Sequence, residues 1–265
     1  MQLKFDIKVA QDYSSPSQKV KVLTEHWVTH QIYCPNCGQA DVSKYPNNKP
    51  VADFFCLNCK EDYELKSKQG KMGVKIVDGA YQTMIERLQS SNNPNFFLLN
   101  YNPRSLKVSD FFVIPKHFFV PNIIEKRQPL SPTAVRAGWV GCNIVVKSIP
   151  ETGKIFFIKN GVIEAKNRVI SEWKRTLFLR EEKQIAAKGW LLDIMRCIDR
   201  LNKKEFVLND IYIFESELRR LHPDNQHIKD KIRQQLQVLR DKGYLNFVTH
   251  GKYRLNNRYE SNIKF

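Results

Sequence analysis

The chain has 265 residues, and its 43 lysines and arginines exceed its 27 aspartates and glutamates to give a formal net charge of +16. A field of this strength attracts polyanions, which makes nucleic acid the leading partner and an anionic membrane surface the alternative. The sequence has no run of eighteen apolar residues and no long basic amphipathic helix, so no membrane partner is expected. The opening residues MQLKFDIKVA alternate like a strand and lack a signal-peptide apolar segment, which predicts a cytoplasmic protein.

Residues 17–31 place apolar side chains at helical spacing and predict a helix whose N-cap is Ser17. Most of the segments that follow are short and apolar, with turn residues at their ends, as strands are. Strands are expected at 51–55, 62–67, 95–101, 110–115, 154–160 and 161–167, and a second helix at 78–89. Strands and helices mixed in this order predict an α/β (α+β) domain.

Charges accumulate and the hydrophobic pattern lapses at 180–188, which predicts an interdomain linker. Helical periodicity then returns in three stretches, and two short strands flank a His-Gly turn within 244–255. The three predicted helices are 189–201, 208–221 and 227–243. Helices followed by a terminal hairpin predict an all-α, winged-helix domain. The expected division is an N-terminal α/β domain at 1–182, a winged-helix domain at 183–258 and a tail at 259–265.

Four of the six cysteines form two Cys-x-x-Cys pairs with a spacing typical of structural zinc: Cys34, Cys37, Cys56 and Cys59. Four thiolates complete a closed tetrahedral shell, so such a zinc ion would hold the fold and perform no chemistry. An iron–sulfur cluster uses the same ligands and is not excluded by the spacing. The two remaining cysteines are expected to be small buried hydrophobes: Cys142 and Cys197.

An acidic and basic triplet brackets the second cysteine pair. Glu64 and Lys66 lie two residues apart and therefore share one face of the predicted strand. If 51–55 pairs with this strand in antiparallel fashion, Asp53 falls opposite Glu64, with facing β-carbons about 5 Å apart. Two such carboxylates suit Mg²⁺, which completes its octahedron with water and phosphate oxygens. Lys66 would then position the attacking water and stabilise developing negative charge.

The cysteine pair lies at the tip of this hairpin, and we therefore expect the zinc site to hold the two strands in register. Taken alone, the triplet is a weak signal, because similar groups of charges occur on many solvated strands. Glu25, on the leading helix, is either an outer carboxylate of the metal site or a surface acid beside Lys21.

A prolyl residue three positions before Asp53, a short hairpin and a Glu-x-Lys strand after a leading helix resemble the PD-(D/E)xK nuclease core. Over nearly the whole chain the sequence is similar to the DpnI-like family of methyl-directed type II restriction endonucleases. The segments that carry this resemblance are YCPNCG, NNKPVADFFC, YELKSK, DGAY, NNPNFFLL, PLSPTAVRAGWVGCNI, KGW and HIKDKIRQQLQVLRDK. The main departures are the linker, the wing around NFVTHGKY and the tail NNRYESNIKF.

The resemblance implies a PD-(D/E)xK nuclease domain with a zinc site and a C-terminal winged helix, both engaging DNA. It also implies magnesium-dependent double-strand cleavage, with blunt ends, at GATC sites carrying N6-methyladenine. The catalytic positions carry over onto Asp53, Glu64 and Lys66. The zinc ligands carry over onto the four paired cysteines, and all of these residues are intact.

Recognition of an N6-methyl group requires apolar contact in the major groove. Trp139 is the candidate, since the resemblance implies that its loop contacts the methyl group, and a core tryptophan is the alternative. The apolar stripe of the 227–243 helix must face the domain core, so its polar residues face outward, where arginine suits guanine and glutamine suits adenine. The candidate DNA contacts are Arg136 and Trp139, then Arg233, Gln234 and Gln237 on this helix, and Lys252 and Arg254 on the wing.

The sequence thus predicts a two-domain, magnesium-dependent endonuclease directed to methylated double-stranded DNA, acting as a monomer. The alternative is a non-catalytic DNA-binding regulator that combines a zinc ribbon with a winged helix. An RNA-processing nuclease is a third hypothesis, because it would share the same catalytic core.

Overall fold

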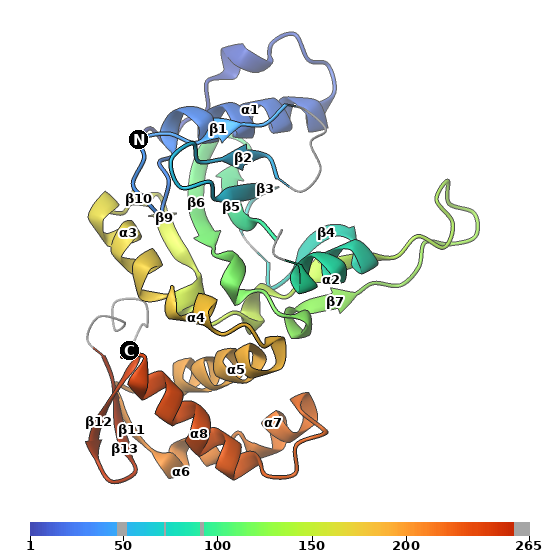
Figure 1. The fold of residues 1–265 in the computed structure, drawn as a ribbon. Coiled ribbons are helices and arrows are strands. Elements are labelled where there is room, and N and C mark those ends of the chain that lie inside the picture. The colour runs from blue at the N-terminus through green and yellow to red at the C-terminus, as the bar shows by residue number, and fades with distance from the viewer. Residues whose placement is uncertain (47–51, 72, 91–92, 257–265) are drawn as a thin grey trace.

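The computed structural model describes residues 1–46, 52–71, 73–90 and 93–256, which form two bodies stacked on one another (Figure 1). The first body is built on a seven-stranded sheet. Its strands, in spatial order, are β1 (Ser43–Lys44), β2 (Phe54–Phe55), β3 (Asp62–Gln69), β5 (Asn95–Asn102), β6 (Lys107–Ile114), β9 (Ile155–Lys159) and β10 (Val162–Ile163).

Only β3 and β5 run parallel in this sheet, and the other neighbouring strands are antiparallel. Parallel neighbours require a crossover connection rather than a tight hairpin. Here the crossover consists of β4 (Ile76–Ala80) and α2 (Tyr81–Gln89), and it leaves the plane of the sheet. The crossover therefore brings β4 beside the strand that carries Glu64 and Lys66.

The central strand β5 is buried on both faces, as its uninterrupted apolar sequence predicts. Alternate side chains enter different cores, because successive residues of a strand point to opposite faces. Phe97 and Leu99 pack in a cluster with residues of α1 (Pro16–Gln31) and α3 (Lys166–Arg175). Phe96 and Leu98 belong to the second cluster, on the other face. The sheet thus separates two hydrophobic cores.

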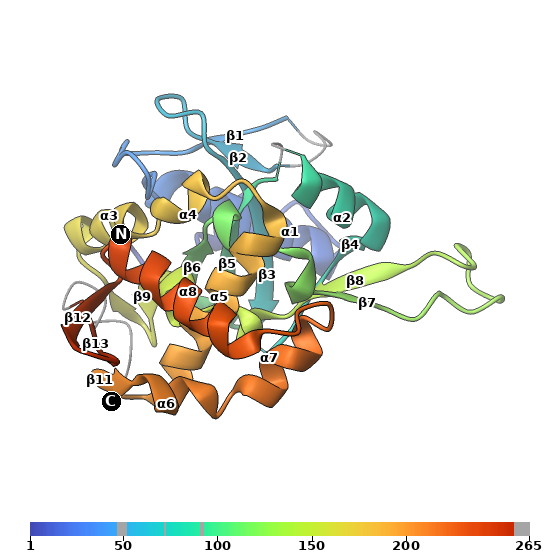
Figure 2. The same ribbon diagram turned by 60° about the horizontal axis from the view of Figure 1, so that its bottom comes forward.

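A second, three-stranded sheet has the order β4, β8 (Gly141–Ile144), β7 (Ile124–Lys126) and is antiparallel throughout. Between β7 and β8, residues 127–140 extend away from the body as a long arm in both views (Figures 1 and 2). We call this segment the arm. Helix α2 contacts all three strands of this sheet.

The second body contains helices followed by a hairpin, in the order predicted for a winged helix. Its elements are α5 (Ile185–Leu201), β11 (Glu205–Val207), α6 (Leu208–Tyr212), α7 (Glu215–Leu221), α8 (Ile228–Asp241), β12 (Leu245–Thr249) and β13 (Lys252–Leu255). The strands form a small sheet of order β11, β13, β12. The stripe of α8 that faces inward is buried, as expected: Ile228, Ile232, Leu236 and Leu239.

The core does not stop at the junction between the two bodies. A single hydrophobic cluster contains Phe112 and Ile114 from β6 together with Ile194 and Ile198 from α5. Helix α4 (Phe178–Glu181) precedes α5 closely, so only residues 182–184 of the predicted 180–188 linker lie outside helices. The prediction of an extended linker is therefore wrong in its length, because the junction is built from packed helices.

Several local predictions are wrong in where an element begins or ends. The opening residues do not form a regular strand: Lys4 makes one isolated bridge to Lys107, and a 3₁₀ helix follows. The predicted strand at 161–167 ends at Ile163, and α3 begins three residues later. The helix predicted at 78–89 begins only at Tyr81. The helix predicted at 208–221 is divided into α6 and α7. The N-cap of the first helix is Ser15 and not the predicted Ser17. The 3₁₀ helices are Ile7–Ala10, Lys116–Phe118, Pro121–Ile123, Val146–Ser148 and Glu151–Gly153.

Candidate functional site

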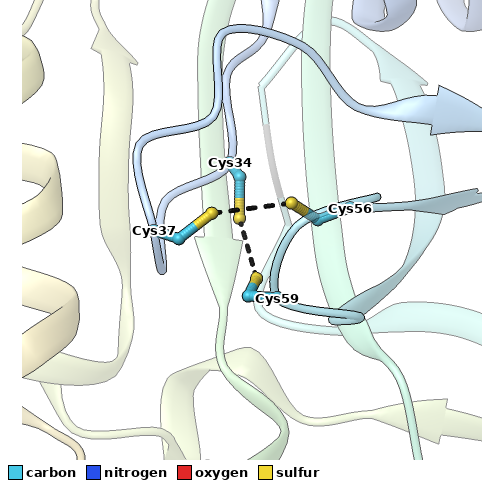
Figure 3. A group of neighbouring side chains, drawn as sticks. All are labelled: Cys34, Cys37, Cys56 and Cys59. Carbon is cyan, nitrogen blue, oxygen red and sulfur yellow. Dashed lines mark hydrogen bonds between the residues drawn. The ribbon is translucent and has the colours of Figure 1, made fainter.

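The four paired cysteines converge at one end of the seven-stranded sheet (Figure 3). Cys34 and Cys37 come from the loop after α1, and Cys56 and Cys59 from the turn between β2 and β3. Their Sγ atoms all lie within 4.8 Å of one another, with 3.5 Å between Cys34 and Cys59 and 3.6 Å between Cys37 and Cys56. A tetrahedral zinc ion places its sulfur ligands about 3.8 Å apart. The cluster therefore fits a structural zinc ion.

The two knuckles share a backbone geometry. In each, the N–H four residues after the first cysteine donates to that cysteine's carbonyl, from Gly38 to Cys34 at 2.9 Å and from Lys60 to Cys56 at 3.0 Å. Gly38 and Lys60 both have a positive φ, of 78° and 59°. This conformation is natural for glycine but uncommon for lysine, so the second knuckle maintains a less favourable backbone.

The protein environment treats the thiols unequally. Burial raises the pKa of Cys34 far above the ordinary thiol value, although its Sγ lies 3.1 Å from the hydroxyl of Tyr63. Burial acts in the same direction on Cys37, but hydrogen bonds from Gln39 and Asn58 outweigh it and lower the pKa of Cys37 to about 7. A bound cation would supply the positive charge needed to keep Cys34 ionised, since metal binding releases thiol protons.

The predicted antiparallel pairing of β2 with β3 is present. Phe54 pairs with Tyr63, so the next position of the same register places Asp53 opposite Glu64. The Asp53 N–H donates to the Tyr63 carbonyl at 2.9 Å, and the Asp53 Oδ2 accepts the Leu65 N–H at 2.7 Å. The backbone of β3 thus holds the aspartate carboxylate against the strand that carries the other two residues of the triplet.

The Lys66 ammonium contacts two carboxylates from different strands, and an arginine approaches one of those carboxylates. Its Nζ lies 2.6 Å from Glu64 Oε1, and it also forms an ion pair with Asp78 on β4. Arg87, from α2, approaches the other oxygen of Glu64 at 3.7 Å. Sequence reasoning missed Asp78 as a site residue. The only signal for it was its place in the DGAY segment, which carries no spacing relation to Lys66.

Burial controls the ionisation of this cluster. Burial raises the pKa of Asp53, and the Leu65 N–H opposes that shift. Burial likewise raises the pKa of Glu64, against the opposing effect of Lys66. For Lys66, burial favours the neutral amine, but Glu64 and Asp78 outweigh it and raise its pKa above the ordinary lysine value. Lys66 is therefore a charged ammonium between two carboxyl groups.

The donor set of this cluster suits a hard divalent cation. Oε2 of Glu64 is buried and has no hydrogen-bond partner in the described part of the chain. Such an oxygen costs free energy unless a ligand satisfies it. Within the described residues the four cysteines are the only group of three or more potential ligands found together. Asp53 and Glu64 would consequently need water and substrate oxygens to complete a magnesium shell.

Glu25 on α1 is buried, which excludes the expectation of a surface acid. Its carboxylate lies 2.7 Å from Nζ of Lys44 and 3.7 Å from Nζ of Lys21. Glu25 also contributes to the raised pKa of Asp53. Its charge therefore acts on the Asp53 carboxyl.

A basic cavity adjoins the triplet. It has a volume of about 340 Å³ and is lined by residues 65–68 of β3 and 75–77 at the start of β4. Lys66, Lys68 and Lys75 all border it. Lysines lining one cavity favour an anionic occupant such as a phosphate, although Lys66 is paired with Glu64 and Asp78 and Lys75 with Glu125.

The arm carries two of the predicted DNA contacts. Trp139 is half-buried and does not belong to either hydrophobic core, so the expectation of a core tryptophan is wrong. The Arg136 guanidinium lies over its ring, 5.0 Å from the centroid. The ring lies so close to Gly141 that a β-carbon there would come within 2.8 Å of it. The indole is thus held between a guanidinium and the β8 backbone.

The three predicted contacts on α8 border one pocket of the second body. Arg233, Gln234 and Gln237 line a shallow pocket of about 450 Å³ together with the wing residues Phe247 and Tyr253. Arg233 also pairs with Asp230.

The two wing cations are already engaged by an acid. Lys252 and Arg254 both pair with Glu205 of β11, at 2.7 Å and 2.5 Å. A phosphate that bound both cations would therefore compete with this carboxylate.

Cys142 and Cys197 are fully buried, as predicted. Every helix in the described ranges is too short or too polar to cross a bilayer.

The fold and the cysteine cluster define a mixed α/β domain with a site that fits zinc, joined to a helical domain that ends in a hairpin. Residues 1–182 match the family model of DpnI, the Dam-replacing family, and residues 186–255 match that of the Dam-replacing HTH domain. The chain belongs to the Dam-replacing family.

The geometry of the cysteine cluster predicts one zinc ion per chain. Cys34→Ser and Cys59→Ser should each abolish stoichiometric zinc binding and lower the melting temperature of the first body, because the metal can no longer close both knuckles. Metal analysis and thermal denaturation would measure both effects. Cys197→Ala, a buried thiol far along the chain, is the control and should retain zinc. Full zinc occupancy in the two serine variants would contradict the assignment.

Proposed function

We propose that this protein is a type II restriction endonuclease that cleaves double-stranded DNA at GATC sites carrying N6-methyladenine, with magnesium as cofactor and blunt ends as product. The observation that carries the proposal is the arrangement of Glu64 and Lys66 on one face of β3 with Asp53 opposite. Membership of the Dam-replacing family supports a restriction nuclease that acts on DNA.

The PD-(D/E)xK motif accounts for the order of these elements. A leading helix α1, a short β2–β3 hairpin and the Glu64–Lys66 face of β3 follow one another as that nuclease core requires. The prolyl residue of the motif, Pro50, lies outside the described residues. Under this proposal 1–182 is the nuclease domain, 183–258 is the DNA-reading domain, and 259–265 is a tail that also lies outside the described residues.

Magnesium held by Asp53 and Glu64 would polarise the scissile phosphate and acidify a bound water. Oε2 of Glu64 supports this choice of ligand, because it accepts no hydrogen bond from the described residues and Arg87 approaches it only to 3.7 Å. Lys66 keeps its ammonium beside the reacting phosphate, where it orients the attacking water and offsets the charge that accumulates on the phosphate oxygens. Lys68 and Lys75 border the same cavity and would bind flanking phosphates of the strand.

In this proposal the zinc site acts on catalysis only through the hairpin. Cys56 and Cys59 form the turn between β2 and β3, and the Cys56 N–H closes that turn on the Glu61 carbonyl at 2.9 Å. The metal would thereby fix the register that sets Asp53 against Glu64. It remains a closed, structural site with no position for substrate.

Both bodies would read DNA. Trp139 on the arm presents an apolar ring for the methyl group, and Arg136 beside it would contact a phosphate or guanine. From α8, Arg233, Gln234 and Gln237 would reach base edges in the major groove.

Lys252 and Arg254 would bind phosphates, which position a protein without specifying sequence. Because Glu205 already pairs with both, the phosphates must displace that carboxylate. We expect one chain to contact each site, as a monomer.

The proposal is tested with one plasmid prepared in two forms, methylated and unmethylated on adenine at GATC. With magnesium, discrete fragments should appear from the methylated form alone, and Lys66→Ala should reduce the rate by about 10²- to 10³-fold because a charge at the transition state is lost. Gel electrophoresis of a time course measures both. DNA binding without cutting at any magnesium concentration would favour the non-catalytic regulator, and cleavage of RNA in competition would favour the RNA-processing nuclease.

Trp139→Ala should reduce the preference for methylated over unmethylated DNA by up to about thirty-fold, since two buried methyl groups contribute about 1 kcal/mol each. Single-turnover rates on the two forms give the ratio. Val135→Ala, on the same arm and fully exposed, is the matched control and should keep the preference. Unchanged discrimination in the tryptophan variant would remove this residue from methyl recognition.

Divalent metal binding should strengthen as pH rises. A carboxyl must lose its proton before it binds metal, and burial raises the pKa of both Asp53 and Glu64. Protons therefore compete with the metal at pH values above about 4, where exposed carboxyls are already ionised. Lys66→Ala should move the transition to still higher pH, because Lys66 lowers the pKa of Glu64. Electron paramagnetic resonance of bound Mn²⁺ without DNA measures the affinity, and a pH-independent affinity from pH 4 upward would refute the assignment.

A further inference from the structure

Lys66 has an acidic partner that comes from outside the nuclease motif. Asp78 lies on β4, twelve residues further along the chain and in a different sheet, and it forms an ion pair with the Lys66 ammonium. Its side chain is only 6% exposed, less than those of Glu64 and Lys66 at 17% and 23%. The carboxylate is therefore buried against the one lysine proposed to act in the reaction.

An irregularity in β4 supports a specific placement of this side chain. Asp78 pairs with Cys142 and Ala80 with Gly141, so Gly79 has no partner on β8 and the register shifts there. Such a bulge bends the strand and redirects a side chain, and bulges are frequent beside active sites. The buried Sγ of Cys142 lies 3.5 Å from the Gly79 carbonyl and packs against the bulge. Asp78 is thus held in place by backbone geometry as well as by its ion pair.

The charges around Lys66 indicate what this placement accomplishes. Glu64 and Asp78 both contact the ammonium, Arg87 faces the far oxygen of Glu64, and Asp53 stands across from Glu64. Under the proposed function Glu64 would bind the divalent cation through Oε2, so the cation would share the carboxylate charge that now pairs with Lys66 through Oε1. The same cation repels the ammonium. Glu64 alone would therefore not retain Lys66 at the reacting phosphate.

Within the described residues, Asp53, Glu64 and Asp78 do not form a group of three carboxyl side chains close enough to share one ion. The contact of Asp78 with Lys66 does not depend on the position of Glu64, because the two carboxylates lie on separate strands.

We propose that Asp78 is a positioning residue that keeps the Lys66 ammonium directed at the scissile phosphate when Glu64 binds the metal. This inference rests on the proposed nuclease function and extends it to a residue that the nuclease motif does not contain.

Asp78→Asn tests the proposal, because it removes the charge and keeps the shape of the side chain. On methylated duplex DNA its single-turnover rate at saturating enzyme and magnesium should fall by about 10²-fold, as expected when a reacting group is misplaced by about 1 Å. Three properties should stay close to those of the wild type. They are the magnesium concentration for half-maximal rate, the affinity for DNA in calcium, and the melting temperature measured without magnesium. Glu151→Gln, which loses a carboxylate paired with Lys154 at 2.6 Å, is the control and should cleave normally.

Three results would overturn the proposal. An unchanged rate would show that Glu64 alone holds Lys66. A raised magnesium requirement would show that Asp78 is itself a metal ligand. Weakened DNA binding together with a lowered melting temperature would show a purely structural role. If the wild-type protein does not cleave methylated DNA at all, the proposed function is wrong. The melting temperature measured without magnesium still reports whether Asp78 stabilises the fold.

Discussion

Closure of the β2–β3 hairpin is the constraint on which the candidate active site depends. Strand β2 consists of Phe54 and Phe55 alone, and two residues of ladder are too short to define a register securely. The cysteine cluster at the hairpin's tip joins this strand to the loop after α1. A metal ion bound by these cysteines would cross-link the two segments and hold the short strand in register. A zinc ion in the cluster would thus add to the backbone hydrogen bonds that hold Asp53 opposite Glu64.

The hairpin is also tied to the junction between the two bodies. Glu61, directly after the second knuckle, is buried and accepts a hydrogen bond from Arg180 of α4 at 2.7 Å and another from Asn95 at 2.9 Å. Arg180 also donates to Nδ1 of the buried His117, whose pKa burial lowers well below the ordinary value. A neutral histidine is required, because Nδ1 must accept that bond. A charged network thus connects the second cysteine knuckle to the helices that lead into the second body.

Local patterns predicted most of the central elements and failed at their margins. The strands at 95–101 and 110–115 and the helix at 227–243 were visible because each depends on residues near one another in sequence. Helix α3 was missed because its apolar residues are few and a strand-like VIEA precedes it. The 180–188 segment was predicted to be a linker because it is rich in charged residues. One of these charges, on Arg180, pairs with Glu61, which is distant in the sequence.

The sequence by itself determined the four cysteines of the cluster that fits zinc and the common face of Glu64 and Lys66, because cysteine spacing and strand alternation are local properties. The family was also recognisable from the sequence, since its motifs are contiguous. Only the tertiary structure decided that Asp78 pairs with Lys66, that the arm extends from the body, and that Glu205 engages the wing cations. Each of these depends on a crossover or a sheet pairing between distant segments, and short-range periodicity carries no information about such contacts.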